Sequence, residues 1–280
     1  MAFGFASYNF LICALLVLQC GYGISARMTI ERRMYLEEEI DDDLINITNP
    51  KPSYNVWFTP KDLYKGFTKP VYFEKEDPAK MPYFLSKEEA DAIPFAIPEL
   101  DNILARFSIS RNSPQGKAIA YTIYNCDLHP TSHMIASCVS SLESMLDLVQ
   151  KSYGPNTNFD LYTSVIHHSE NTPLLQNYTF LDTPYQIPTQ KMIACHPMPY
   201  PYAIFYCHGH LDGSTKVYKI PLGGEYGDRV EAIAVCHADT SGWDKDHISF
   251  KMLHMKPGSG PVCHVIPQNN FVWIPTNSVH

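Results

Sequence analysis

Four Cys-His dipeptides constrain the fold of this 280-residue chain more than any other feature. They follow the pattern CH-x10-CH-x27-CH-x25-CH-x8-W, which ends at Trp273. Two of them close residues 202–208 and 230–237, where β-branched, aromatic and small residues predict strands. Successive side chains on a strand point to opposite faces, so a Cys and the His after it cannot easily bind the same ion. We therefore expect the cysteines on one face and the histidines on the other.

The two expected faces differ in chemistry. The residues concerned are His196, His208, His237 and His264 on one face and Cys195, Cys207, Cys236 and Cys263 on the other. Four imidazoles suit copper or zinc, whereas four thiols in an oxidising compartment suit two disulfides. Mixed Cys/His ligation of structural zinc is the rival interpretation, but the gaps of 10, 27 and 25 residues lack its short Cys-Cys spacing. Copper is the expected metal and zinc the runner-up.

Cys126 and Cys138 flank a loop and pair with each other if the other four cysteines pair among themselves. Sequence alone leaves the connectivity of six cysteines open. Four further histidines could add metal ligands, although loop histidines are usually solvated: His129, His133, His167 and His168.

The first residues indicate the compartment. Residues 10–18 form an apolar run too short to span a bilayer, and small residues follow it. This predicts a secretory signal peptide over residues 1–25, whose removal leaves an even number of cysteines. Asn46 and Asn177 begin glycosylation sequons, which fits a secreted glycoprotein. No second apolar stretch suggests a membrane anchor, so no membrane association is expected after cleavage.

The net charge excludes one class of partner, and the composition indicates the fold class. The net charge of −8 gives no basic surface that would attract nucleic acid. The 22 prolines mostly interrupt short apolar segments, which favours short strands over long helices. We expect an α+β fold, predominantly β, in a single domain over residues 70–280 with a few scaffold helices.

Capping signals place those helices. Ser86 and Glu89 form a capping box, as do Ser140 and Glu143, and proline after Ser113 starts a third helix. Residues 98–107 carry apolar side chains at helical spacing. These helices are expected to support the sheet.

Residues 26–69 are expected to form a disordered leader. An acidic run over residues 37–43 repels itself, and prolines hold the following segment extended. Deletion of residues 26–65 should therefore leave the domain folded. Tyr54 and Trp57 are conspicuous in such a leader: either they dock onto the domain or they are substrate.

Several segments beside the Cys-His array give the chain a family resemblance. The quoted motifs are Phe73-Glu-Lys, Cys138-Val-Ser-Ser-Leu-Glu-Ser144, Cys236-His-Ala-Asp-Thr-Ser-Gly-Trp243, Pro257-Gly-Ser-Gly-Pro-Val-Cys-His264 and the final Trp273. Over about residues 70 to 275 they resemble the BURP domain of plant secreted proteins. The resemblance implies a plant protein of the cell wall, apoplast or storage vacuole.

The resemblance also implies a chemistry. Some family members are copper-dependent peptide cyclases that join a Tyr or Trp side chain of a core peptide to another residue. By that analogy the four histidines are the copper ligands, and Tyr54 and Trp57 are candidate substrate side chains. Members that carry their own substrate often show repeated core peptides beginning with Gln, whereas residues 26–70 contain no Gln and no repeat. The implied partner is a core peptide in cis or in trans, and this departure argues against the cis route, which leaves a separate peptide or a chain without the activity.

Two other functions stay open at this point. One is a non-enzymatic wall or vacuole protein linked to seed development or stress, in which the array only holds the fold. The other is a partner of cell-wall polysaccharide, by analogy with the family's polygalacturonase subunit. An open metal position beside a cleft would favour catalysis, and a closed shell would favour structure.

Overall fold

The computed structural model describes residues 56–75, 77, 81–127, 134–210 and 212–276. Its strands form two sheets in which every described strand pair is antiparallel. The larger sheet has the order β1-β12-β11-β10-β6-β2, with β5 paired to β11 and β7 to β10. The smaller sheet has the order β3-β9-β8-β13-β4. The expected α+β fold with predominant β structure is confirmed.

The strands are short, as the proline-interrupted sequence predicts. In the larger sheet they are β1 (Trp57–Phe58), β2 (Thr68–Tyr72), β5 (Val165–His167), β6 (Leu175–Phe180), β7 (Tyr185–Ile187), β10 (Thr215–Gly224), β11 (Arg229–His237) and β12 (Val262–Ile266). In the smaller sheet they are β3 (Met134–Val139), β4 (Phe159–Tyr162), β8 (Ile193–Met198), β9 (Ile204–His210) and β13 (Phe271–Pro275).

The two sheets share one apolar layer. Ala194 and Val272 of the smaller sheet pack in the same buried cluster as Val217, Val235 and Ile266 of the larger sheet. Side chains two residues apart on a strand share a face. His196, His237 and His264 each lie two residues from a member of this layer. These three histidines therefore lie between the sheets.

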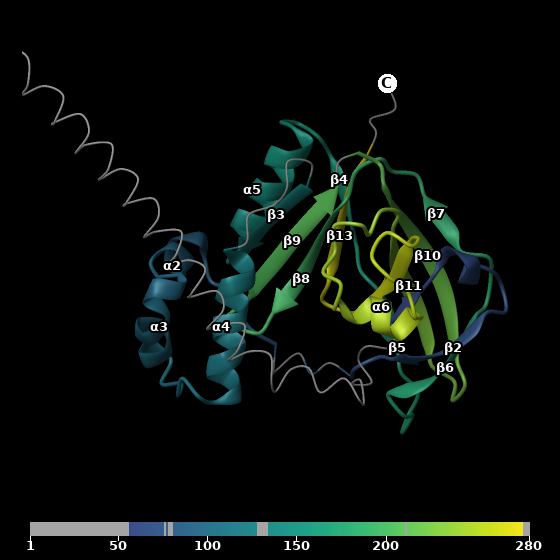
Figure 1. Ribbon diagram of the computed structural model, residues 1–280, viewed down its shortest axis with the longest axis horizontal. Helices are drawn as coiled ribbons and strands as arrows, with labels where there is room; N and C mark the ends of the chain where they lie inside the picture. Colours follow the sequence, from purple (N-terminus) through teal and green to yellow (C-terminus); the bar gives the residue numbers. More distant parts are fainter. Residues whose placement is uncertain (1–55, 76, 78–80, 128–133, 211, 277–280) are drawn as a thin grey trace, which may run out of the picture. The chain divides into compact units, whose positions relative to one another are not determined.

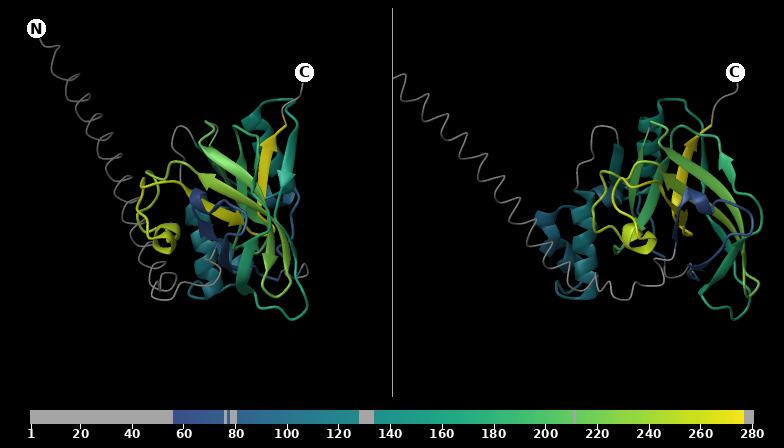
Figure 2. Two further views of the ribbon diagram at one scale, coloured as in Figure 1. Left: turned by 90° about the vertical axis from the view of Figure 1, so that its right-hand side faces the viewer. Right: turned by 45° about the vertical axis from the view of Figure 1, so that its right-hand side comes forward.

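Helices cover the outer face and one edge of the smaller sheet (Figures 1 and 2). They are α2 (Lys87–Asp91), α3 (Leu100–Arg106), α4 (Pro114–Cys126) and α5 (Leu142–Tyr153). Helix α6 (Ile248–Leu253) instead packs against β1 of the larger sheet, and two 3-10 turns are η2 (Pro60–Asp62) and η4 (Ile97–Glu99). Met145 and Val149 of α5 pack on Cys195, Cys207 and Trp273. Trp273 is therefore part of the core, and only 5% of it is exposed.

The capping signals match the helix starts with one difference. Ser86 and Glu89 form the expected capping box at α2, and the Ser113 hydroxyl accepts from Gly116 N at α4. At α5, however, the cap is Ser141, whose hydroxyl accepts from Ser144 N, whereas Ser140 and Glu143 were expected to form the box. The strand β3 continues to Val139, so the extended cap residue falls one position later.

The ordered fold begins earlier than the expected boundary at residue 70. Strand β1 pairs with β12, setting Trp57 opposite His264, and strand β2 pairs with β6. Phe58 is 1% exposed and meets the Phe180 ring edge-on, with a centroid separation of 6.1 Å. Residues 56–69 thus belong to the folded domain rather than to a disordered leader.

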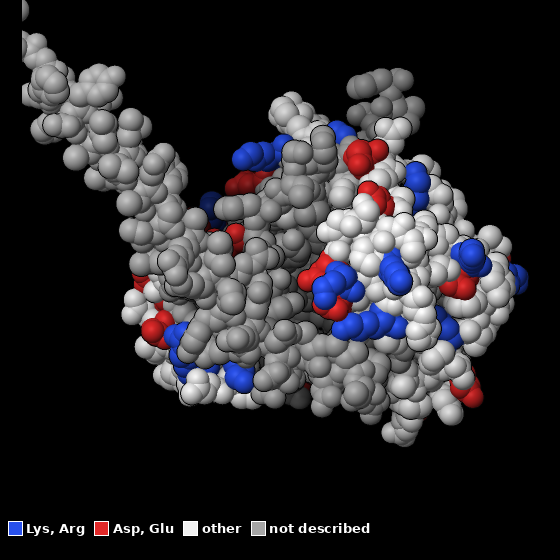
Figure 3. Space-filling view, viewed as in Figure 1, with Lys and Arg blue, Asp and Glu red and all other residues white. Residues whose placement is uncertain are grey.

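The visible surface carries mixed charge. In Figure 3 the described Lys, Arg, Asp and Glu side chains are interspersed on this face and form no continuous basic patch. Among the helices of the described segments, none is long and apolar enough to cross a bilayer.

Candidate metal centre

The four histidines of the Cys-His dipeptides meet between the two sheets. His196 and His208 come from β8 and β9 of the smaller sheet, and His237 and His264 from β11 and β12 of the larger sheet. His237 and His264 are buried, whereas His196 and His208 are partly exposed. We call these four residues the histidine cluster.

The cluster forms a closed ring of imidazoles. Ring centroids lie 5.1 Å apart for His196 and His208, and 6.2 Å apart for His208 and His237. The circuit closes through separations of 5.6 Å from His237 to His264 and 6.3 Å from His196 to His264. The shortest contact joins two Nε2 atoms, those of His196 and His208, at 3.1 Å. Residues from four strands and two sheets therefore meet at one point.

Burial keeps these imidazoles neutral. Desolvation lowers the pKa of His196, and it lowers the pKa of His264 to about 3. Desolvation, together with neighbouring histidines, holds the pKa of both His208 and His237 well below the usual histidine value. Neutral imidazole is the form that binds metal ions. The cluster is thus in its ligating protonation state at neutral pH.

Hydrogen bonds orient two of the rings. The Nδ1 of His196 lies 2.7 Å from Oδ1 of Asn270, and the Nδ1 of His264 lies 3.4 Å from the Val265 carbonyl oxygen. An oxygen acceptor at Nδ1 favours the Nδ1–H tautomer and leaves the Nε2 lone pair free. Such contacts are typical of metal-binding histidines.

The donors fit a metal in part. Two imidazole nitrogens on one tetrahedral ion, with bonds of about 2.0–2.1 Å, are about 3.3 Å apart. The His196–His208 separation of 3.1 Å is close to this value. Within the described residues, no group of three or more His, Cys, Asp or Glu side chains is arranged to hold a metal ion. The cluster therefore supplies the donor type and one matching pair, and a third ligand requires the rings to rotate.

Aromatic side chains wall the cluster on the side of β1 and α6. The Trp57 ring lies 4.8 Å from that of His264 and 5.3 Å from that of His247. The Trp243 ring lies 5.1 Å from that of His237 and 4.8 Å from that of His247. Trp57 Nε1 is buried without a hydrogen-bond partner. An oxidisable indole is thus in direct contact with the cluster.

Strand β1 is fixed by a partly buried lysine. The ammonium group of Lys69 donates to the Trp57 carbonyl oxygen. Desolvation lowers the pKa of Lys69 to about 8, and nearby Asp62 opposes that shift. This contact ties the Trp57 backbone to β2.

The cysteines lie on the opposite faces of the same strands. Cys195–Cys207 joins β8 to β9 and Cys236–Cys263 joins β11 to β12, each between residues that are direct partners in the ladder. The third disulfide joins Cys126 at the end of α4 to Cys138 on β3. The expected Cys126–Cys138 disulfide is confirmed, and the other four cysteines pair among themselves as expected. The pairing within those four, which the sequence left open, holds together the strand pairs that carry the histidines.

Two further histidines near the cluster were not expected from the Cys-His pattern. His247 caps α6, where its Nδ1 lies 2.7 Å from the Ser249 hydroxyl, and it contacts both tryptophans. His210, two residues after His208, acts electrostatically to lower the pKa of both His208 and His237. Because His210 lies two residues after His208 on β9, the two side chains share a strand face, and this spacing could have predicted that His210 lies near the cluster.

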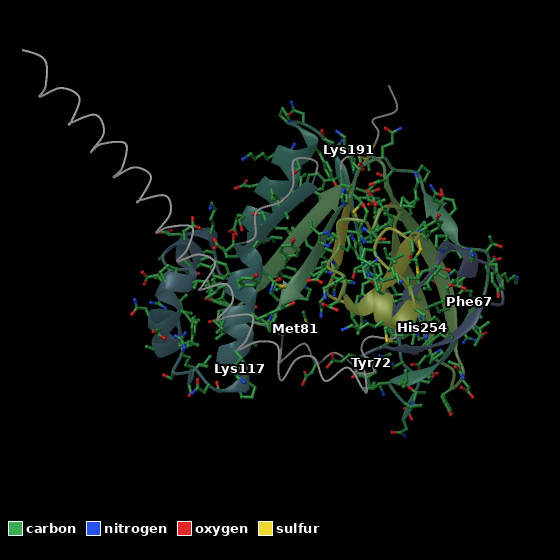
Figure 4. The ribbon with its side chains drawn as sticks, in the orientation of Figure 1. Phe67, Tyr72, Met81, Lys117, Lys191 and His254 are labelled. Carbon is green, nitrogen blue, oxygen red and sulfur yellow. A yellow bond between two sulfur atoms is a disulfide. The ribbon has the colours of Figure 1, made fainter. Side chains whose placement is uncertain are left out.

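A cavity of about 200 Å³ lies beside the cluster. Val56, Tyr72, Ile166 and Asn270 are among its lining residues, and Tyr72 is labelled in Figure 4. Asn270 both lines this cavity and contacts His196.

A second buried polar cluster lies elsewhere in the larger sheet. The Asp228 side chain is fully buried and accepts from Ser169 N at 2.7 Å, Tyr178 Oη at 3.0 Å and Gln176 Nε2 at 3.1 Å, and its Oδ2 lies 2.9 Å from His168 Nδ1. Burial acts to raise the pKa of Asp228, but these hydrogen bonds hold it below its ordinary value. His168 is therefore neither a solvated loop histidine nor a member of the histidine cluster. We call these residues the Asp228 cluster.

The remaining predicted residues are not gathered at the cluster. Tyr54 and Asn46 lie outside the described residues, as do His129 and His133. Asn177 is exposed on β6, where its Nδ2 donates to Glu225 at 3.1 Å.

The part of the chain that matches a known family has nearly the same boundaries as the described fold. The family model described as the BURP domain matches residues 56–275, which begins at the residue before β1. The BURP domain protein USPL1 of Arabidopsis thaliana is 44% identical over 227 residues, covering 80% of this chain and 81% of the relative.

Two further relatives extend the comparison. The BURP domain-containing protein BNM2A of Brassica napus is 42% identical over 227 residues, covering 80% of each chain. The BURP domain protein RD22 of Arabidopsis thaliana is 35% identical over 223 residues, covering 79% of this chain and 56% of the relative. The sequences similar to this chain thus come from plants and carry the same domain.

Proposed function

The chain belongs to the BURP domain family, and from this premise we propose that it is a secreted plant protein whose histidine cluster binds copper. One observation carries the proposal: four neutral imidazoles from two sheets meet in one ring, with two Nε2 atoms 3.1 Å apart. Imidazole nitrogens suit copper and zinc. Copper is favoured because oxidisable tryptophans line the cluster, and zinc has no redox chemistry.

For the activity, we propose oxidative crosslinking of an aromatic side chain in a peptide, a cyclase reaction. Joining a Tyr or Trp side chain to a second residue removes two hydrogen atoms, and O2 takes up the two electrons and two protons as hydrogen peroxide. Bound copper would supply the one-electron steps. The chain's own part is to hold neutral imidazoles in place, to press an indole against His264, and to shield the cluster with Trp243 and α6.

The substrate side chain is either in this chain or in another peptide. Trp57 supports the first route because its ring is 4.8 Å from the ring of His264. Tyr54 is three residues earlier, outside the described residues. A separate core peptide would have to approach from the partly exposed side, where His196 and His208 lie.

A non-enzymatic role is the second candidate, and a specific observation favours it. As placed, the described residues offer no third metal donor, and β1 is bonded into the sheet over the cluster. In this role the cluster would join the two sheets of a wall or vacuole protein and would have no catalytic part. Binding to cell-wall polysaccharide is a third role by family analogy, and retention on immobilised pectin would test it.

Mass spectrometry separates these roles. The secreted protein is incubated with Cu²⁺ under air, digested with trypsin, and compared with a copper-free sample and a His237→Ala variant. A loss of about two mass units in the peptide that contains Tyr54 and Trp57, only with copper and intact His237, would support self-modification. Bound copper with an unmodified peptide would point to a substrate in trans or to the non-enzymatic role. Absence of bound copper would overturn the copper proposal.

A further inference from the structure

Asn270 lies where the two sheets meet the histidine cluster. It ends the turn between β12 and β13, and its backbone N–H donates to the Pro267 carbonyl at 3.4 Å. The ladder between β13 and β8 pairs Phe271 with Cys195, so one step further it sets Asn270 opposite His196. Only 7% of Asn270 is exposed. Its side chain therefore faces His196 from a buried and defined position.

Both ends of the Asn270 amide are committed. Its Nδ2 donates to the Gln268 carbonyl oxygen at 2.9 Å, and its Oδ1 lies 2.7 Å from Nδ1 of His196. Rotating the amide by half a turn would set Oδ1 against the Gln268 carbonyl oxygen and place two acceptors together. The amide orientation is thus fixed, and His196 must carry its proton on Nδ1.

This tautomer decides what the other side of the ring can do. With Nδ1 protonated, Nε2 of His196 presents a lone pair, and that atom is the one 3.1 Å from Nε2 of His208. In the metal-free protein His208 must then donate its Nε2–H across this contact. In the opposite tautomer of His196, the Nε2 of His196 would itself carry the hydrogen and would have no lone pair for a metal ion.

We propose that Asn270 is the positioning residue of the histidine cluster, selecting the Nδ1–H tautomer of His196 and aiming its Nε2 at His208. The tautomer part stands on the contacts alone, and the part about copper rests on the proposed function. An amide acts here in the role that a carboxylate or backbone carbonyl has beside many metal-binding histidines.

The test compares two replacements of nearly the same shape. Asn270→Leu removes the acceptor, and Asn270→Asp keeps it. Long-range ¹H–¹⁵N spectra of the metal-free protein report which ring nitrogen of His196 is protonated. We expect Nδ1–H in the parent protein and in Asn270→Asp, and loss of this preference in Asn270→Leu. Copper affinity should fall roughly 10- to 100-fold in Asn270→Leu and stay within a few-fold in Asn270→Asp.

Controls keep the outcomes distinct. Asn102→Leu alters an exposed asparagine on α3 and should change neither readout. If Asn270→Leu does not fold, Asn270→Ala removes the same acceptor without added bulk. An unchanged His196 tautomer in the Leu or Ala variant would overturn the inference, whatever the copper affinity. If the Leu or Ala variant changes the His196 tautomer but the parent protein binds no copper, the inference about Asn270 is upheld and the copper proposal is overturned instead.

Discussion

The histidine cluster and the Asp228 cluster are both buried among the strands of the fold, yet their polar atoms are satisfied in opposite ways. Asp228 is an ionised group with hydrogen-bond partners on both of its carboxylate oxygens. The histidine cluster contains four neutral rings that contact one another, one amide and one backbone carbonyl. A buried charge is tolerated when donors surround it, whereas clustered imidazoles depend on staying neutral.

The two clusters also differ in what they leave unsatisfied. The Asp228 cluster ties the turn before β11 to β6 and the segment after β5 through both carboxylate oxygens, and among its atoms His168 Nε2 is buried without a hydrogen-bond partner. The histidine cluster leaves ring nitrogens facing each other and an indole N–H without a partner. Incompletely satisfied polar groups in an otherwise consistent fold are expected at functional sites.

The largest expected effect is that of removing the wall of the histidine cluster. Deleting residues 26–65 takes away β1 and Phe58, and loss of a buried Phe alone costs about 3–5 kcal/mol. The earlier expectation that this deletion leaves the domain folded is therefore replaced by loss of cooperative unfolding. Deleting residues 26–55 instead should preserve it. Equal thermal transitions for both deletions would show that β1 is dispensable.

Next in size is the loss of the buried carboxylate. Asp228→Ala leaves His168, Gln176 and Tyr178 facing a void, and breaking such a buried group costs about 3–5 kcal/mol of unfolding free energy. Denaturant unfolding measures this, and copper affinity should not change. Asp182→Ala, at an exposed carboxylate, is the matched control. A fall in copper affinity with Asp228→Ala would break the division between the two clusters.

Replacing a member of the histidine cluster should give the reverse pattern. His208→Ala and His237→Ala each remove one imidazole and should each lower the bound copper, while changing the unfolding free energy by at most about 2 kcal/mol. Copper content is read by elemental analysis and stability by denaturant unfolding. His254→Ala, at a histidine beyond α6, controls for general effects. Unchanged copper content in both cluster variants would remove these residues as ligands.

The last comparison concerns pH acting on the metal-free protein, where the contributions of the two clusters should begin to be lost at different pH values. Histidines whose folded pKa is depressed are neutral in both states above about pH 6.5. As pH falls below that value the unfolded chain binds protons first, so stability declines towards the folded pKa of about 3 for His264.

The Asp228 cluster should respond at lower pH. The folded pKa of Asp228 lies below its ordinary value, so its contribution is present above about pH 4 and is lost as pH falls through the folded pKa. Urea midpoints measured from pH 7 to pH 3 resolve the two windows. Asp228→Asn should flatten only the part below about pH 4. If Asp228→Asn instead flattened the pH dependence of the urea midpoint near pH 6, the assignment of the low-pH window to Asp228 would be contradicted.

Much of the site follows from local sequence rules. Period-two alternation placed four cysteines and four histidines on opposite faces, and the two disulfides among those cysteines and the ring of imidazoles agree with that separation. A capping box located α2, and Ser113 with the proline after it located α4, because these signals depend on a few neighbouring residues. The cap of α5 was misplaced by one residue because the end of β3, set by pairing with β9, decides where the chain can turn.

Long-range features escaped the sequence because nothing local specifies them. Trp57 and Phe58 look like leader residues between prolines, and only pairing with β12 makes them part of the core. His168 looks like a loop histidine until Asp228, sixty residues away, is seen to lie beside it. No spacing rule connects Asn270 to His196, because their contact depends on the register of β13 against β8.

The sequence by itself determined which histidines share a strand face, that the cysteines on the other face can form disulfides, and which family the chain resembles. Those properties depend on residue type and on the two-residue period of a strand, which are local. The tertiary structure alone decided that histidines from two sheets share one point, that Trp57 closes over them, and that Asn270 orients one of them. Those properties depend on sheet packing and register, which arise only when segments distant in sequence fold together.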